Sequence, residues 1–212
     1  MNENARSEPI LVIDPGHGGE DGGAVSVLGA KESEINLDIA RRLSSLCDLF
    51  GVEYKLTRDS EEIDYPAEET TVAARKRWDT RKRLEKISST PGAVLLSIHQ
   101  NHYPSAAVRG PQVFYGSAEG SRELAELLQE RMTACLYPSN RRLAAPCPEG
   151  VYLMKHAPCT AVLCECAFLS NGEEAALLMT KSYREKTALI LLSSYLQYSE
   201  ERHESEERVL LH

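Results

Sequence analysis

The sequence predicts a single α/β domain, in which a twisted mixed sheet of about six strands is flanked by helices on both faces. Residues 10–13 form a continuous and mostly β-branched apolar run, typical of a strand covered on both faces. Similar runs recur along the chain and alternate with segments of helical periodicity. The 212 residues, 42% of them hydrophobic, suffice for one sizeable core, and no linker, repeat or low-complexity block divides them.

The elements follow from these patterns in chain order. Apolar residues at helical spacing predict a helix that starts at Glu32 and ends near Leu49, with Gly51 as its C-terminal cap. Short apolar runs predict five further strands, at residues 52–57, 93–99, 110–115, 152–154 and 161–165. Helical spacing predicts four further helices, at residues 72–87, 121–135, 172–179 and 182–198. Loops are expected at residues 59–70, which are rich in Glu, and at residues 137–149, which contain three prolines.

The two ends of the chain differ from the predicted domain, which we expect to span residues 9–199. Residues 1–8 are polar and are predicted to be a disordered N-terminal remnant, and residues 200–212 to be a charged, frayed helical extension. The formal charge of −8 argues against nucleic acid or an anionic membrane as a partner. The basic run within residues 72–87 is interpreted as a solvated helix face rather than a binding patch.

The most informative segment is the glycine-rich loop that follows the first strand and carries His17. Ligands in open α/β sheets collect beyond the carboxyl ends of the strands, so this histidine lies where chemistry is usually done. Three interpretations compete: a phosphate-binding loop, a tight turn with a solvated histidine, and a metal site. The first lacks the Gly-Lys-Ser/Thr ending of a P-loop. The third needs partners, because a catalytic zinc takes three protein ligands.

Candidate partners occur at another strand end and at a helix start. The apolar run at residues 93–98 ends in His99, so two strands would each deliver a histidine to one edge of the sheet. His102 is the nearest rival to His99, but on an extended continuation it would lie on the opposite face. Glu32, in the first turn of its helix, is a plausible oxygen ligand. Its alternative role is that of an acid that interacts with the helix dipole.

Six motifs in order resemble the zinc-dependent N-acetylmuramoyl-L-alanine amidases, from about Ile10 to Leu196. They are Asp14-Pro15-Gly16-His17-Gly18-Gly19, Asp21-x-Gly23, Glu32-x-x-x-Asn36-Leu37, Thr57-Arg58, Ser97-Ile98-His99-x-Asn101 and Glu165-x-x-Phe168-Leu169-Ser170-Asn171. The segments at residues 110–115 and 150–156 are similar to the spore-cortex, or germination, branch of that family. The resemblance implies one zinc per chain bound by His17, Glu32 and His99, with Glu165 as the catalytic carboxylate.

The resemblance also implies a substrate and a reaction. The enzyme would be a peptidoglycan hydrolase that cleaves the amide between the muramic acid lactyl group and L-alanine, with Asn101 and Lys155 as candidate substrate-binding residues. Lys155 stands where many relatives have arginine, and retains a positive charge for a substrate carboxylate. Such an enzyme acts outside the cytoplasm, so we expect that an export signal or anchor is absent from this sequence. An activating protein partner is compatible with the sequence.

Two other functions stay open: a zinc carboxypeptidase or deacylase that acts on other small amides, and a wall-binding module without turnover. Retention of the three ligands together with Glu165 disfavours the module, because binding alone needs no general base. A structural alternative for Glu165 is a cap of the helix that follows Gly172.

The cysteines have no pattern that demands chemistry. Cys159, Cys164 and Cys166 lack the paired C-x-x-C spacing of a structural zinc site. Strand alternation places Cys164 and Cys166 opposite Glu165, and we interpret them as small buried hydrophobes. A disulfide scaffold is disfavoured, although a single pair such as Cys135 with Cys147 stays open.

Overall fold

The computed structural model describes residues 9–210, with only the backbone at 206, 207, 209 and 210. The segment at residues 1–8 that we predicted to be disordered lies outside the described residues. The strands are β1 (Ile10–Pro15), β2 (Tyr54–Leu56), β3 (Ala93–Asn101), β4 (Gln112–Tyr115), β5 (Ala145–Pro146) and β6 (Thr160–Phe168). The helices are α1 (Glu32–Phe50), α2 (Val72–Ser88), α3 (Ser121–Leu136), α4 (Tyr152–His156), α5 (Gly172–Leu178) and α6 (Lys181–Leu210).

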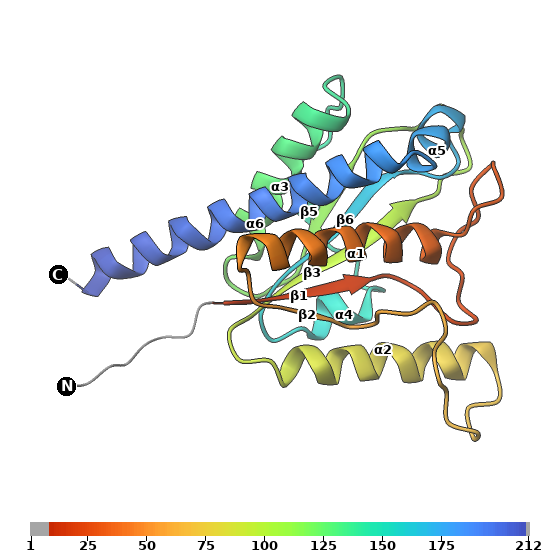
Figure 1. Ribbon diagram of the computed structural model, residues 1–212, viewed down its shortest axis with the longest axis horizontal. Helices are drawn as coiled ribbons and strands as arrows, with labels where there is room; N and C mark the ends of the chain where they lie inside the picture. Colours follow the sequence, from red (N-terminus) through yellow and green to blue (C-terminus); the bar gives the residue numbers. More distant parts are fainter. Residues whose placement is uncertain (1–8, 211–212) are drawn as a thin grey trace.

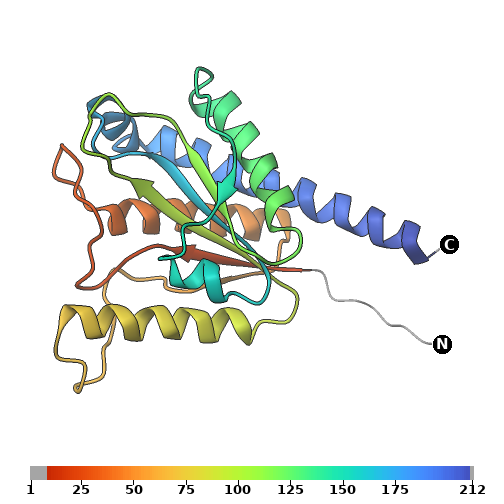
Figure 2. The same ribbon diagram turned by 180° about the vertical axis from the view of Figure 1, so that it is seen from behind.

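Within the described residues the strands form one mixed sheet in the order β2-β1-β3-β6-β4-β5. Strands β2, β1, β3 and β6 are parallel, whereas β4 is antiparallel to β6 and parallel to β5. Helices α1, α3 and α6 cover one face, and α2 and α4 cover the other (Figures 1 and 2). The predicted α/β class, with a mixed sheet and helices on both faces, is therefore confirmed.

Alternation along the strands divides the core into two layers. Leu11 and Ile13 pack with the apolar faces of α1, α3 and α6, whereas Val12 packs with residues of α2 and α4. Helix α1 ends as predicted, at Gly51 in the left-handed conformation (φ 69°). Both faces of β1 are thus covered, which explains why its sequence is apolar without interruption.

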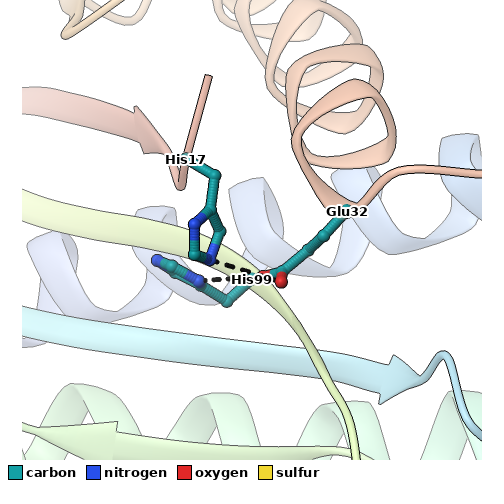
Figure 3. A group of neighbouring side chains, drawn as sticks. All are labelled: His17, Glu32 and His99. Carbon is teal, nitrogen blue, oxygen red and sulfur yellow. Dashed lines mark hydrogen bonds and ion pairs between the residues drawn. The ribbon is translucent and has the colours of Figure 1, made fainter. Parts of the chain in front are cut away.

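The parallel strands deliver their carboxyl ends to one edge of the sheet. Pro15 at the end of β1 pairs with Ile98 of β3, and His99 is directly opposite Glu165 of β6. The first turn of α1 lies at the same edge (Figure 3). His17 and His99 are 82 residues apart in the sequence, and His99 and Glu165 are 66 apart, yet the parallel pairing of β1, β3 and β6 brings all three to one edge of the sheet.

The structure corrects two of the predicted elements, at residues 152–154 and 137–149. The expected strand at residues 152–154 is wrong, because this segment is the short helix α4, whose Leu153 and Met154 enter the core beneath the sheet. The predicted loop at 137–149 contains the two-residue strand β5. Helix α6 runs without a break through residues 199–210 and projects beyond the sheet (Figure 1). Among the described residues, no helix has the length and apolar character needed to cross a bilayer.

Candidate metal centre and active site

The fold brings His17, Glu32 and His99 together at the carboxyl edge of the sheet. Figure 3 shows the three side chains pointing toward one another from the glycine loop, the start of α1 and strand β3. One ring nitrogen from each histidine and one carboxylate oxygen all lie within 4.8 Å of one another. The two rings are edge-to-face, with centroids 5.0 Å apart. This is the predicted ligand set, and within residues 9–210 it is the one such group of three or more potential ligands.

Two glycines make this approach possible. A Cβ on Gly16 would overlap the imidazole of His99, which packs directly against the loop backbone. At Gly23, whose φ is 67°, a Cβ would lie 2.6 Å from Glu32 Oε2 and 2.8 Å from the ring of His17. A side chain at either position would therefore overlap His99, or Glu32 and His17. The close packing of these side chains against the backbone explains the glycines in this segment.

Glu32 is held as an ionised acceptor. Its Oε2 accepts a hydrogen bond from the Ala24 amide (3.0 Å), and its Oε1 accepts one from the Gln100 amide (3.1 Å). The His17 Nε2 and His99 Nδ1 atoms lie 3.3 and 3.0 Å from its two oxygens. Burial by itself would raise the pKa of Glu32, but the hydrogen bonds and charges of the two histidines lower that pKa far below its usual range. The carboxylate is buried, so it is not a solvated helix-dipole acid.

His17 has a second partner on its other ring nitrogen. Nδ1 lies 3.0 Å from Asp21 Oδ2, which also lies 2.8 Å from Lys76 Nζ. Burial opposes protonation of His17, but Asp21 and Glu32 together raise its pKa to about 9. A carboxylate on the second nitrogen fixes the tautomer and orientation of a metal-binding histidine, and Asp21 is in position to do so.

Glu165 lies beside the triad in a different environment. It pairs in register with His99, and its Oε2 is shielded from solvent with no hydrogen-bond partner in the described part of the chain. Burial raises the pKa of Glu165 to about 7, with His99 opposing and Glu32 adding to the shift. The cap of α5 is supplied by Asn171, whose side chain accepts a hydrogen bond from the Glu174 amide. The alternative capping role for Glu165 is therefore wrong.

His17, His99 and Glu165 line a cavity of about 340 Å³. Lys76 and Thr80 of α2 and residues 150–154 line it as well, whereas Glu32 does not. Asn101 and Lys155 do not line this cavity: Asn101 accepts a hydrogen bond at its backbone from Leu169, and Lys155 is exposed on α4. Their predicted contact with substrate stays a prediction. His102 is exposed and outside the ligand group.

The cysteines take no part in the site. Cys164 and Cys166 are completely buried in the core on the far face of β6 from Glu165, as predicted. All six cysteines are free, so the pair Cys135 and Cys147 is not a disulfide in this structure. None belongs to a group of potential metal ligands among the described residues, so a structural zinc site is not found there.

Arg83 is the main residue that the sequence interpretation missed. Most of the basic run on α2 is exposed, as predicted for a solvated face, but Arg83 is buried and forms an ion pair with Asp14 (2.9 Å). One signal was available: Arg83 precedes the buried Ile87 by one helical turn and therefore lies on the apolar face of the helix. The cavity wall formed by α4 was also missed, because that segment was assigned to a strand.

The fold and the geometry of the site indicate the chemical class of the protein. An α/β domain that brings two histidines beyond strand ends together with a carboxylate from a helix start, with a second carboxylate of raised pKa beside them, has the kinds of donor groups found in metal-dependent hydrolases. Comparison with known proteins narrows this class. Residues 11–193 match the N-acetylmuramoyl-L-alanine amidase family, and the chain belongs to it. The protein is thus a peptidoglycan hydrolase of the amidase type, as its motifs predicted.

Individual relatives agree with this assignment. The germination-specific N-acetylmuramoyl-L-alanine amidase of Bacillus subtilis is 33% identical over 92% of this chain and 82% of its own length. The B. subtilis amidase LytC is 29% identical over 89% of this chain, which spans 35% of the longer protein. Among solved structures, the CwlD amidase from Clostridioides difficile, in complex with the GerS lipoprotein, superposes with a TM-score of 0.85 at 31% identity. That match covers 90% of this chain and 98% of CwlD.

Proposed function

We propose that this amidase binds one zinc ion through His17, Glu32 and His99 and uses Glu165 as the general base against the lactyl-L-alanine amide. The position of Glu165 carries the proposal. Its Oε2 has no partner among the described residues, yet it is buried beside a ligand histidine in the same cavity. A buried carboxylate oxygen without a hydrogen-bond partner costs free energy, and a catalytic role is one explanation for its presence. A pKa of about 7 also suits proton transfer near neutral pH.

The residues present fit zinc. Tetrahedral ligands about 2.0–2.2 Å from zinc lie roughly 3.3 Å from one another. His17 Nε2 lies 3.3 Å from Glu32 Oε2 and His99 Nδ1 lies 3.0 Å from Glu32 Oε1, and one donor atom from each of the three residues lies within 4.8 Å of the other two. Two imidazoles and one carboxylate form a donor set that is common in catalytic zinc sites and leaves one position for water.

The chemistry divides between the ion and the chain. Zinc supplies an electrophile that lowers the pKa of a water molecule and polarises the scissile carbonyl. Glu165 accepts a proton from the attacking water as the new carbon–oxygen bond forms. It then donates that proton to the alanine nitrogen as the carbon–nitrogen bond breaks, which releases a free amino terminus. Glu32 stays ionised throughout, because backbone amides and both histidines stabilise its charge.

The similarity to a germination-specific amidase and to CwlD supports a role on the spore cortex, outside the cytoplasm. The solved complex of CwlD with a lipoprotein supports a protein partner for this chain as well.

Digestion of purified peptidoglycan tests the reaction. Cortex and vegetative peptidoglycan are incubated separately with the zinc-loaded protein, and the products are analysed by mass spectrometry. We expect peptide-free glycan and peptides with free L-alanine amino termini, formed faster from cortex. Release of a C-terminal amino acid would indicate a carboxypeptidase instead, and equal rates on both substrates would contradict the cortex role.

Elemental analysis tests the metal. The purified protein should contain one zinc per chain, and His99→Ala should contain much less. His102→Ala is the matched control, since His102 is exposed and outside the ligand group. Equal zinc in wild type and His99→Ala would remove His99 from the site.

A further inference from the structure

The loop that carries His17 has an unusual backbone. His17 has a φ of 62°, and it is the one residue other than glycine in the left-handed region among residues 9–210. Residues with a Cβ adopt this region rarely, and they persist there when the surrounding structure fixes them. The position of this ligand therefore depends on groups outside the loop.

Arg83 of α2 reaches the loop from beneath the sheet. Its Nη1 donates to the Pro15 carbonyl (2.6 Å) and to Asp14 Oδ1 (2.9 Å), and its Nη2 donates to the His17 carbonyl (2.6 Å). Asp79, one turn earlier on α2, accepts from Nε at 2.8 Å. The side chain is 5% exposed. Every edge of the guanidinium group is thus used, and two of its contacts are with backbone on either side of Gly16.

Arg58, which follows β2, also donates to this backbone. Its Nε donates to the Pro15 carbonyl (3.0 Å), and its Nη2 donates to the Gly16 carbonyl (3.1 Å). We call Arg58 and Arg83 the carbonyl clamp. Three successive carbonyls, from Pro15 to His17, accept hydrogen bonds from these two buried guanidinium groups.

The clamp does more than balance a buried charge. Asp14 already accepts hydrogen bonds from Thr57 and Ser97 and needs one cation nearby. An ion pair with Asp14 would use a single amino group of Arg83. Arg83 Nε pairs with Asp79, but Arg83 Nη2 donates to the His17 carbonyl, and Arg58 Nε and Nη2 donate to the Pro15 and Gly16 carbonyls, contacts that an ion pair alone does not require.

We propose that Arg83 is a positioning residue for the metal centre: it holds the His17 backbone in the left-handed conformation so that the imidazole meets Glu32 and the metal. The inference rests on the proposed function in treating His17 as a metal ligand. It links helix α2, most of whose basic residues are exposed, to the geometry of the site.

Arg83→Lys separates positioning from charge. A lysine retains the positive charge beside Asp14, but its single ammonium lacks the planar fork that spans the Pro15 and His17 carbonyls. Arg81→Lys is the matched control, because the Arg81 side chain lies on the same helix and is 58% exposed. All variants are made in the full chain, and folding is verified by circular dichroism.

Two measurements are made on each variant. Zinc affinity is measured by competition with a chelator, and exchange of the Gly18 amide, which donates to the Asp21 carbonyl at 2.8 Å, is measured in the metal-free protein. We expect Arg83→Lys to bind zinc about 10- to 100-fold more weakly, as loss of a group that orients a ligand commonly does. Its Gly18 amide should exchange faster than in wild type. Arg81→Lys should match wild type in both.

A folded Arg83→Lys with wild-type zinc affinity and unchanged Gly18 exchange would overturn the positioning role. If that variant does not fold, Asp79→Asn decides, because it leaves Arg83 in place but weakens the contact that orients Nε. Several-fold weaker zinc binding and faster Gly18 exchange support the proposal, and wild-type values overturn it. Should the wild type itself bind no zinc, the proposed metal site fails, and the Gly18 exchange rates of the metal-free proteins still decide the clamp.

Discussion

Two glutamates at the same edge of the sheet have opposite surroundings. Glu32 begins helix α1, accepts hydrogen bonds from two backbone amides and contacts two histidines. Glu165 lies in strand β6 opposite His99, and its Oε2 has no partner in the described chain. The pKa of Glu32 is accordingly held far below its usual range, whereas burial raises the pKa of Glu165 to about 7.

This difference supports separate roles for Glu32 and Glu165, which residue type alone does not distinguish. A carboxylate that stays ionised is suited to bind a cation, and one that titrates near neutral pH is suited to accept and donate a proton. Pairs of acids whose environments separate their pKa values are a recurring device for dividing labour within one site. The comparison predicts that replacement of Glu165 by glutamine lowers the rate of hydrolysis, whereas replacement of Glu32 by glutamine weakens metal binding.

Glu165→Gln should have the largest effect on turnover. An amide cannot accept the proton of the attacking water, so hydrolysis should fall by about 10²- to 10⁴-fold. Zinc content should stay at the wild-type level, because Glu165 is outside the ligand group. Product release and elemental analysis on the same preparation test both statements. Loss of zinc would make Glu165 a ligand, and near-normal activity would remove it from the mechanism.

Glu32→Gln should instead remove the metal. Losing a direct ligand should weaken zinc binding by more than the roughly 10- to 100-fold expected for loss of a supporting partner. Glu34→Gln is the matched control, since Glu34 is exposed in the same first turn of α1. If the helix dipole were the reason for Glu32, the two variants would behave alike in chelator competition.

Asp21→Ala tests the group that supports His17. Because Asp21 Oδ2 contacts His17 Nδ1 at 3.0 Å, its removal should weaken zinc binding by about 10- to 100-fold while the three ligands remain. Glu20→Ala removes an equal charge from an exposed neighbour and should have little effect. Equal zinc affinity in the two variants would show that the loop backbone alone orients His17.

The site could be predicted from sequence to the extent that it depends on strand ends. The apolar runs that end near His17, His99 and Glu165 have strong patterns, and parallel pairing brings such ends to one edge. A helix start that Gly51 caps nineteen residues later makes Glu32 a plausible oxygen ligand, but the choice of Glu32 over a helix-dipole acid, and the catalytic role of Glu165, rest on the resemblance to the amidases. The positions of the strand ends and of the helix start depend on local periodicity and on a topological rule, so they are visible in a single sequence.

What was missed depends on long-range contacts. Helical spacing places Arg83 on the same face of α2 as Ile87, but the partner that keeps its charge buried, Asp14, lies 69 residues earlier and is not visible in the local pattern. The segment at residues 152–154 has too few residues to show a period, and its helical state is decided by packing of Leu153 and Met154 in the core. Strand β5 is two residues long and exists only by pairing with β4.

The smallest effect that we predict is the pH dependence of zinc binding that results from protonation of His17. In the metal-free site Asp21 and Glu32 outweigh burial and raise the pKa of His17 from 6.5 to about 9, so at neutral pH this ligand carries a proton that zinc must displace. The apparent zinc affinity should therefore fall as the pH decreases below about 9, by about tenfold per pH unit for one displaced proton. The same shift predicts that His17 stabilises the metal-free fold fully below about pH 6.5, and that this contribution is lost as the pH rises to about 9.

Calorimetric titration with zinc at pH 7, in two buffers of different ionisation enthalpy, counts the released protons. About one proton per zinc is expected for wild type and less for Asp21→Ala, which loses a partner that raises this pKa. Zinc binding without proton release would show that His17 is neutral in the free protein, and would leave the low pKa of Glu32 to be explained by His99 and the backbone amides alone.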